Sequence, residues 1–466
     1  MIPFNIISLT IGRASRDAFL KPSARTQKDR NARGGSRLLG QVAAMLLLLL
    51  LLTSANAANA SVCTSSCNIS VKGNQFLITN GGATTNWISK GLTFGGLVCA
   101  DQTRVDCSSS DKTIAADLIA LQGDNEIAAA MSWGADTIRF QVNQAALDPQ
   151  SAYNQPWYLP YIVGWIRYAR SQNLVVLVSM QWESSSLEVC PIANGPSCKV
   201  PGWVAQSGSP TSSTKGSFGQ SKVISSTAGA WMALAPYFAG DKGVVFEAFN
   251  EPGIEYSPKM SWAAAWASWQ SDHQAVINAI RSVGANNVII LDGLQSARTF
   301  QYMPIPNGIV DPANPSNPQI GYAAHPYEND FTSSDAYLVS MLGYSDFTAN
   351  FGYLRSLGYP IMITEVSATA GVSCYDGTIP GVPAAPTYMN GPGGIMNYAK
   401  TNGIGISGAW AFDDNPSLVA NLSPSSTTWP ALDFSLFNGC GPGSLPAGPG
   451  YDFQQYFLYG IIPTQK

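Results

Sequence analysis

Residues 243–249 read GVVFEAF and are followed by NEPG at 250–253, so a largely apolar run ends in polar residues. Apolar side chains at consecutive positions are typical of a strand that is covered on both faces, as in a parallel sheet. Seven further short runs have the same character. They are WISKGLTFGG at 87–96, DTIRFQV at 136–142, LVVLVSM at 174–180, NVIILDG at 287–293, IGYAAHP at 320–326, PIMITEV at 360–366 and GISGAWAF at 405–412.

Candidate helices follow these runs, with apolar residues at helical spacing. Examples are PYIVGWIRYARSQN at 160–173 and SWAAAWASWQSDHQAVINAIRSVG at 261–284. Strands that alternate with helices imply a parallel sheet joined by right-handed crossovers, and eight such units predict a (β/α)₈ TIM barrel, an α/β fold. Trp262, Trp266, Trp269 and His273 share one face of the second helix, which we interpret as a packing face.

The first 60 residues differ from the rest of the chain. Residues 1–40 hold eight Lys and Arg against two acids, an apolar run covers Val42 to Leu52, and TSANAANA follows at 53–60. This order is typical of a signal peptide, here with a long basic leader. We therefore expect a protein secreted to the outside of the cell or to the periplasm, with residues 61–466 as a single catalytic domain.

Two details of this leader stay open. Cleavage after Ala57 or after Ala60 fits the small-residue rule, and Met45 is an alternative start. An apolar run of eleven residues is shorter than the roughly 20 needed to span a bilayer, so we expect no stable membrane insertion. An uncleaved anchor, as in a cell-wall glycan-binding protein, is the alternative.

The composition beyond residue 60 excludes several classes of function. Seventeen basic against 27 acidic side chains remain, a net charge near −10, which disfavours nucleic acid as a partner. With two histidines and no CxxC motif, a Cys/His metal cluster is not expected, and we predict no metal and no cofactor. The sequence also has no GxSxG elbow, which disfavours an esterase of the α/β-hydrolase type.

All eight cysteines follow the expected cleavage site, and an even number in an exported chain predicts disulfides that staple long loops. Close spacing favours Cys99 with Cys107 and Cys190 with Cys198, which leaves Cys374 for Cys440. The spacing does not exclude other connectivities. The full set is Cys63, Cys67, Cys99, Cys107, Cys190, Cys198, Cys374 and Cys440.

Two carboxylates stand where predicted strands end. Glu251 follows the fourth run and Glu365 lies near the end of the seventh. Because active sites of this barrel type lie at the carboxyl ends of the strands, the two acids should face one mouth. Glycoside hydrolysis needs such a pair, one group to protonate the leaving oxygen and one to stabilise or bond to the sugar carbon. Each Glu taken alone is equally compatible with a helix cap or an ion pair.

These motifs resemble glycoside hydrolase family 5, over about residues 85–415, within the clan of barrel glycosidases that carry their acids on strands four and seven. The Asn-Glu-Pro of FNEPG is highly specific to it. The resemblance implies Glu251 as general acid/base, Glu365 as nucleophile and Asn250 as a contact of the sugar 2-hydroxyl.

Other positions match the same pattern. By resemblance, Arg139 and Tyr327 should pair with the nucleophile and lower its pKa, and Trp410 should stack on a sugar ring. His325 joins the site by the same resemblance. An apolar rim and the charge of Glu365 should keep Glu251 protonated near neutral pH.

The chain departs from the family at the third strand, where Gln181 stands in place of a common His. An amide still offers a donor and an acceptor, so we keep Gln181 as a substrate-binding residue. Trp182 and Trp203 lie in the following loop, where they can wall a cleft or stack on a sugar, and Trp182 is included among the candidate binding residues.

We therefore expect a monomeric, retaining endo-β-1,4-glycanase, with cellulose-type glucan as the first choice of polysaccharide or oligosaccharide substrate. β-Mannanase, xyloglucanase and β-1,3-glucanase remain alternatives because substrate choice depends on loop shape. A carbohydrate-binding protein that kept the barrel and lost turnover is the alternative from another class.

Overall fold

The computed structural model describes residues 63–99, 123–150, 154–181, 227–252, 261–327, 346–367, 389–412, 418–421, 433–436 and 449–463. Residues Asn59–Lys466 belong to one compact unit. Within the described ranges, no helix combines the length and the apolar character that crossing a membrane requires.

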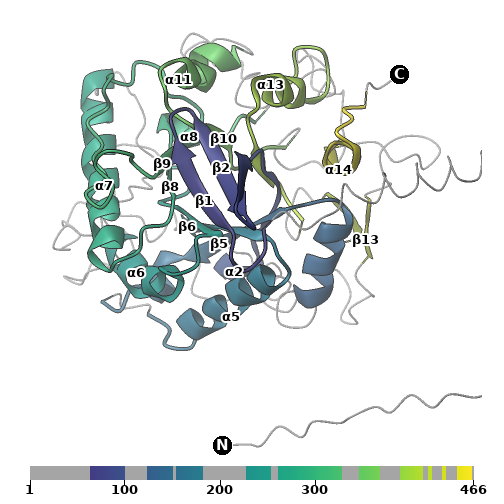
Figure 1. The fold of residues 1–466 in the computed structure, drawn as a ribbon, viewed down its shortest axis with the longest axis horizontal. Helices are drawn as coiled ribbons and strands as arrows, with labels where there is room; N and C mark the ends of the chain where they lie inside the picture. Colours follow the sequence, from purple (N-terminus) through teal and green to yellow (C-terminus); the bar gives the residue numbers. More distant parts are fainter. Residues whose placement is uncertain are drawn as a thin grey trace, which may run out of the picture. The chain divides into compact units, whose positions relative to one another are not determined.

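A closed barrel of eight parallel strands forms the centre of this unit, in the order β10-β11-β4-β5-β6-β7-β8-β9 (Figure 1). Each of the eight apolar runs coincides with one strand to within a few residues, so the predicted (β/α)₈ barrel is confirmed. The strands are β4 (Lys90–Phe94), β5 (Thr137–Asn143), β6 (Val175–Gln181), β7 (Val244–Glu247), β8 (Ile289–Asp292), β9 (Ile320–Ala324), β10 (Ile361–Ile363) and β11 (Ile406–Ala409).

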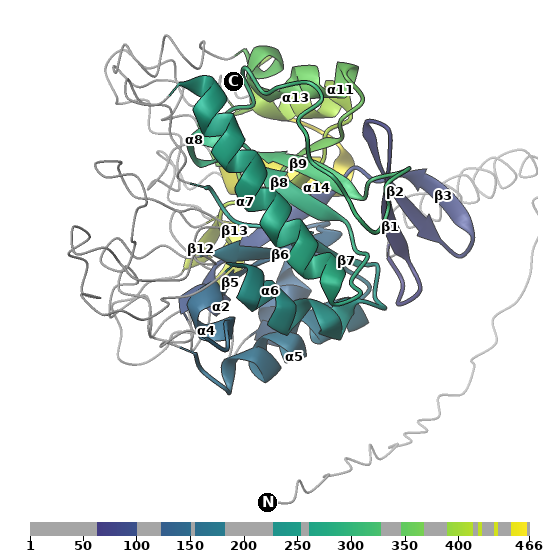
Figure 2. The same cartoon turned by 90° about the vertical axis from the view of Figure 1, so that its left-hand side faces the viewer.

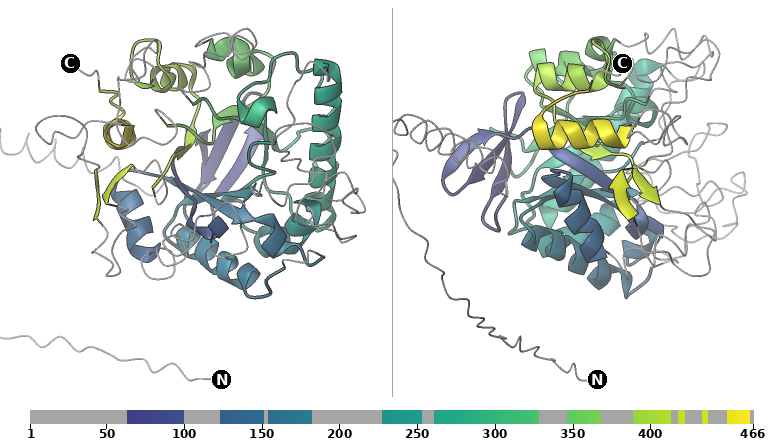
Figure 3. Two further views of the ribbon diagram at one scale, coloured as in Figure 1. Left: turned by 180° about the vertical axis from the view of Figure 1, so that it is seen from behind. Right: turned by 90° about the vertical axis from the view of Figure 1, so that its right-hand side faces the viewer.

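Helices surround the barrel, as Figure 3 shows from two further sides. The described ones are α2 (Gly96–Cys99), α4 (Gln144–Leu147), α5 (Tyr158–Ser171), α6 (Thr227–Leu234), η3 (Ala235–Phe238), α7 (Trp262–Ser282), α8 (Leu294–Ala297), η4 (Thr348–Gly352), α11 (Tyr353–Ser356), α13 (Ile395–Asn402) and α14 (Pro449–Tyr459), and residues 123–132 are helical as well. The antiparallel pair β12 (Val419–Asn421) and β13 (Asp433–Leu436) follows the barrel in the sequence.

The longest of these helices, α7, shows how local sequence sets the bounds of an element. The Ser261 hydroxyl caps its start by accepting a hydrogen bond from Ala264 N at 3.2 Å, and Gly284 follows its end with a φ of 81°. Trp266, Trp269 and His273 are buried and Trp262 is partly buried against the core, in line with the interpretation of this face as a packing face.

One end of the barrel is covered by a three-stranded antiparallel sheet that the sequence analysis did not predict. It consists of β1 (Asn68–Lys72), β2 (Gln75–Asn80) and β3 (Ala83–Asn86). Figure 2 shows this sheet at the end opposite α2 and α4, which directly follow the carboxyl ends of β4 and β5. Its alternating apolar residues share one core cluster with inward residues of the barrel such as Val245 and Ile290. The carboxyl ends of the strands are thus left as the site-bearing mouth.

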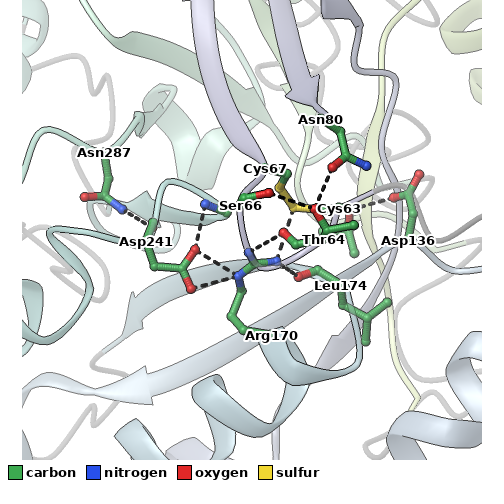
Figure 4. Close-up of a disulfide and its surroundings, with 12 residues drawn as sticks. Cys63, Thr64, Ser66, Cys67, Asn80, Asp136, Arg170, Leu174, Asp241 and Asn287 are labelled. Atoms are coloured by element: carbon green, nitrogen blue, oxygen red, sulfur yellow. Dashed lines mark hydrogen bonds and ion pairs between the residues drawn. A yellow bond between two sulfur atoms is a disulfide. The ribbon is translucent and has the colours of Figure 1, made fainter. Parts of the chain in front are cut away.

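Arg170 ties the start of the described chain to the barrel (Figure 4). From the last turn of α5 it forms an ion pair with Asp241 at 3.0 Å and donates to the carbonyl oxygens of Thr64, at 3.1 Å, and Leu174. A disulfide links Cys63 to Cys67 beside it. The three pairs expected from spacing each include a cysteine outside the described residues, so they stay predictions.

Candidate active site

Seven of the nine predicted site residues lie at or just beyond the carboxyl ends of the strands. Gln181 ends β6, and the others follow β7, β9, β10 and β11 within a few residues. Arg139, expected at the end of its strand, is instead the third residue of β5, and its long side chain brings the guanidinium to Glu365 and Asn250. Trp182 lies outside the described residues. The seven residues at this end are Gln181, Asn250, Glu251, His325, Tyr327, Glu365 and Trp410.

Glu365 is buried and held at both carboxylate oxygens. Arg139 Nη1 donates to its Oε2 at 2.7 Å, and Gln141 Nε2 donates to the same oxygen at 3.2 Å. The Tyr327 hydroxyl donates to Oε1 at 2.6 Å. Three donors from β5 and from the segment after β9 therefore define the orientation of this carboxylate before any substrate binds.

Glu251 is the more accessible acid, with 18% of its side chain exposed. Its Oε1 lies 3.1 Å from His325 Nδ1, and its backbone N–H donates to Asp292 Oδ2 at 2.8 Å. Carboxylate oxygens of Glu251 and Glu365 and a ring nitrogen of His325 lie within 4.8 Å of one another. The two acids therefore face each other across a gap that a sugar carbon and its leaving oxygen can occupy.

Arg139 contacts both the buried Glu247 on β7 and the residues that follow the strands, Asn250 and Glu365. Its Nε donates to Glu247 Oε2 at 2.7 Å, while Nη2 reaches Asn250 Oδ1 at 2.6 Å and Ser179 Oγ at 3.1 Å. Gly408 on β11 makes room for the guanidinium stem, because a Cβ at this position would lie 2.9 Å from Arg139 Cδ. Asn250 is thereby oriented by the same cation that holds Glu365.

With the geometry described, the chain can be compared with known proteins. Residues 116–416 match the family model described as cellulase, glycosyl hydrolase family 5. The chain belongs to glycosyl hydrolase family 5. As a member of this family it is an enzyme, a glycoside hydrolase. No curated protein sequence matches the chain closely enough to serve as a relative.

Solved structures with the same fold include two glycosidases. A β-glucanase from Saccharophagus degradans has a TM-score of 0.50 and 18% identity, over 86% of this chain and 95% of its own. An endocellulase from Pyrococcus horikoshii, in a complex with cellotetraose, has a TM-score of 0.54 and 15% identity, over 85% and 99%. At this identity the two likenesses show the shared barrel.

The buried charges of this family 5 site depend on one another. Burial disfavours the charged form of Arg139, but Glu247 and Glu365 outweigh it and raise the pKa of the guanidinium. Burial likewise lowers the pKa of His325, yet the carboxylates of Asp292 and Glu365 and contacts with Glu247 and Glu251 raise it to about 10. At neutral pH the imidazole is therefore a cation that donates its Nδ1–H toward Glu251.

The pKa of Glu365 differs from the expectation. Arg139 and Tyr327 do lower it, as predicted, but burial is the largest influence, and together with the Glu251 carboxylate it raises the pKa above its ordinary value. The sequence-based argument counted the partners and omitted the loss of solvation that accompanies a buried position.

Four residues at this end of the barrel escaped the sequence analysis. Gln141 touches Glu365, Glu247 pairs with Arg139, Asp292 accepts from Glu251, and the Thr364 hydroxyl lies 2.8 Å from His325 Nε2. A polar residue inside an apolar strand run, as in GVVFEAF or NVIILDG, is the signal that would have found the two acids, because burying an unpaired carboxyl is costly.

Two groups of side chains have the composition of metal ligands. They are Glu247 with Asp292 and His325, and Glu251 with His325 and Glu365. Arg139 already donates to both Glu247 and Glu365, and His325 is a cation, so a metal would have to displace charges of its own sign. We assign these groups to proton and sugar chemistry instead.

Proposed function

We propose that this family 5 enzyme is a retaining endo-β-1,4-glucanase that cleaves cellulose-type glucan by double displacement. The observation that carries the proposal is the approach of Glu251 and Glu365 to within 4.8 Å. Retaining glycosidases hold their two carboxyl groups about 5 Å apart, whereas inverting enzymes leave at least about 6.5 Å for a water molecule.

Glu365 is the proposed nucleophile. Its oxygen bonds to the anomeric carbon as the bond from that carbon to the leaving oxygen breaks, and Glu251 transfers its proton to that oxygen. In the second step Glu251 takes a proton from water, and the water oxygen displaces Glu365 from the sugar. Both carboxyl groups end in their starting protonation state, so the cycle needs no cofactor.

The remaining residues bind or orient. Arg139 and Tyr327 hold Glu365, and Asn250, which Arg139 orients, binds the 2-hydroxyl. Trp410 stacks on a sugar ring, as aromatic faces do on apolar sugar faces. His325 contacts the acid/base Glu251.

Gln181, which stands at the end of the third barrel strand where the family commonly has a His, is compatible with sugar binding. Gln181 is 2% exposed, and its Oε1 has no hydrogen-bond partner in the described part of the chain. A buried acceptor without a donor is costly, and a sugar hydroxyl would satisfy it. Trp182, the next residue, keeps its proposed role as a wall of the cleft.

The choice of glucan is supported by the β-glucanase and by the endocellulase with bound cellotetraose that share the fold. Mannan, xyloglucan and β-1,3-linked glucan are the alternatives to be compared, since subsite shape rather than the barrel selects the polymer.

The test is reducing-sugar release from glucan, mannan, xyloglucan and β-1,3-glucan by the wild type, Glu251→Gln and Glu365→Gln. Each substitution should lower the rate by about 10²–10⁴-fold. Asp124→Asn, on an exposed carboxylate of the outer helix at 123–132, is the matched control and should retain the wild-type rate. Proton NMR of the first product should show the β-anomer.

The outcomes discriminate between the alternatives. Release from a polymer other than β-1,4-glucan would reassign the substrate, and an α-anomer as first product would contradict retention. A folded protein that binds glycans and releases no sugar would favour the carbohydrate-binding alternative.

A further inference from the structure

The backbone at Glu251 adopts an unfavourable conformation. Its φ is 49°, in the left-handed region that residues with a Cβ rarely occupy, and Pro252 follows it. A Cβ makes the left-handed conformation sterically unfavourable, and a following proline further restricts the residue before it. Such a conformation persists only where surrounding contacts hold it.

Asp292 supplies the contact that fits this need. Its Oδ2 accepts the Glu251 backbone N–H at 2.8 Å, so the hydrogen bond is made at the residue whose backbone is turned. Asp292 is fully buried at the carboxyl end of β8, and its own backbone carbonyl accepts from Trp269 Nε1 on α7 at 2.6 Å. Asp292 is therefore held in place as the acceptor for the Glu251 backbone N–H.

The second carboxyl oxygen of Asp292 has no such partner. Oδ1 is buried without a hydrogen bond among the described residues, and His325 Nε2 lies 3.6 Å from Oδ2, beyond ordinary hydrogen-bond length. Burial and then the Glu247 carboxylate raise the pKa of Asp292 well above its usual value, while the charges of His325 and Arg139 oppose that shift. Asparagine at this position keeps a side-chain oxygen that can accept the Glu251 N–H in the same place.

We propose that Asp292 is a positioning residue for the acid/base: by accepting the Glu251 N–H it holds the left-handed turn that directs the Glu251 carboxyl to the leaving oxygen. The inference rests on the proposed function, since it requires Glu251 to be the proton donor. The Asn-Glu-Pro motif puts Glu251 directly after β7, and Asp292, 41 residues further along the chain, orients the Glu251 backbone.

Substrates with different leaving groups report on this role. A sugar hydroxyl needs a proton as it leaves, whereas dinitrophenolate leaves readily without one. Misplacing Glu251 should therefore slow cleavage of a cello-oligosaccharide much more than release of dinitrophenol from dinitrophenyl β-cellobioside. A general loss of structure would slow both.

The experiment measures kcat/KM of the full chain on both substrates for the wild type, Asp292→Ala and Asp292→Asn. We expect the alanine variant to lose at least about tenfold on the oligosaccharide and less than about threefold on the aryl glycoside. Asparagine should restore most of the lost rate, because it keeps the acceptor oxygen.

Asp136→Ala is the matched control. Asp136 precedes β5 at the other end of the barrel and likewise accepts a backbone N–H, that of Lys90 at 2.9 Å. Its removal should lower the thermal unfolding temperature without changing the ratio of the two rates. Wild-type cleavage of both substrates is established first, so a failure of the proposed function is recognised before the variants are compared.

Two results would overturn the proposal. One is an equal loss on both substrates in Asp292→Ala, which would make Asp292 a purely structural residue. The other is an asparagine variant as impaired as the alanine variant, which would show that charge and not the accepted hydrogen bond matters.

Discussion

Arg139 and Glu365 show how single residues of this site depend on partners that lie far away in the sequence. The family resemblance predicted that Arg139 pairs with Glu365, and the two meet at 2.7 Å. The sequence placed Arg139 at a strand end, whereas it lies in the first half of β5 and reaches Glu365 through its long side chain. The direction of the Glu365 pKa shift was not predictable, because it is set by burial, which no motif records.

Tyr327→Phe tests how burial and hydrogen bonding together set the pKa of Glu365, because it removes only the hydroxyl that donates to Glu365 Oε1. Glu365 must be ionised to attack, and its raised pKa places the acidic limb of kcat/KM above the ordinary glutamate value of about 4.3. The Tyr327 hydroxyl bond lowers that pKa, so removing it should move the limb to still higher pH and reduce the rate below it. A pH profile of kcat/KM for both proteins gives the answer. An acidic limb that stays in place or moves down would contradict the assignment of that limb to Glu365.

The N-terminal sheet is the element that the sequence analysis missed. Strands β1 and β2 alternate in burial and β3 is exposed throughout, but the three runs are short and rich in polar residues, so they resemble the start of a loop. Phe76 on β2 shows what they do: its ring lies against the backbone of Gly321, where a Cβ would come within 2.4 Å, and meets Trp87 edge-on. Glycine in β9 thus lets the sheet approach the barrel.

Phe76→Ala should therefore destabilise the fold without altering the chemistry. Truncating a buried Phe costs about 3–5 kcal/mol, and Phe76 is 6% exposed. Urea unfolding should show this loss, while kcat at low temperature stays near the wild-type value because the site lies at the opposite end of the strands. Tyr459→Ala, at a side chain 64% exposed, is the control and should change stability by less than about 0.5 kcal/mol. A proportional loss of kcat would mean that the sheet supports the site directly.

At the scale of the whole molecule, the eight apolar strands form a closed barrel, and Glu251 and Glu365 lie together at the end where the strands finish. The secretion leader expected in residues 1–60, the cleft wall expected at Trp182 and the three disulfides expected from spacing lie wholly or partly outside the described residues. Their roles stay predictions, as does the monomeric state.

Export can be tested by N-terminal sequencing of the protein recovered outside the cytoplasm. Cleavage at the small residues predicts a first residue of Ala58 or Ser61. Recovery of an intact leader in the membrane fraction would instead favour the anchored alternative.

The sequence by itself determined the barrel, the order of its strands and the positions of the residues at their ends. Apolar runs and the residues that close them are local properties, and a closed parallel barrel converts strand ends into one mouth. Only the tertiary structure decided which side chains meet within that mouth. The contacts of Glu247 with Arg139, of Gln141 with Glu365 and of Asp292 with Glu251 join different strands, and the pKa shifts follow from the burial that this packing imposes.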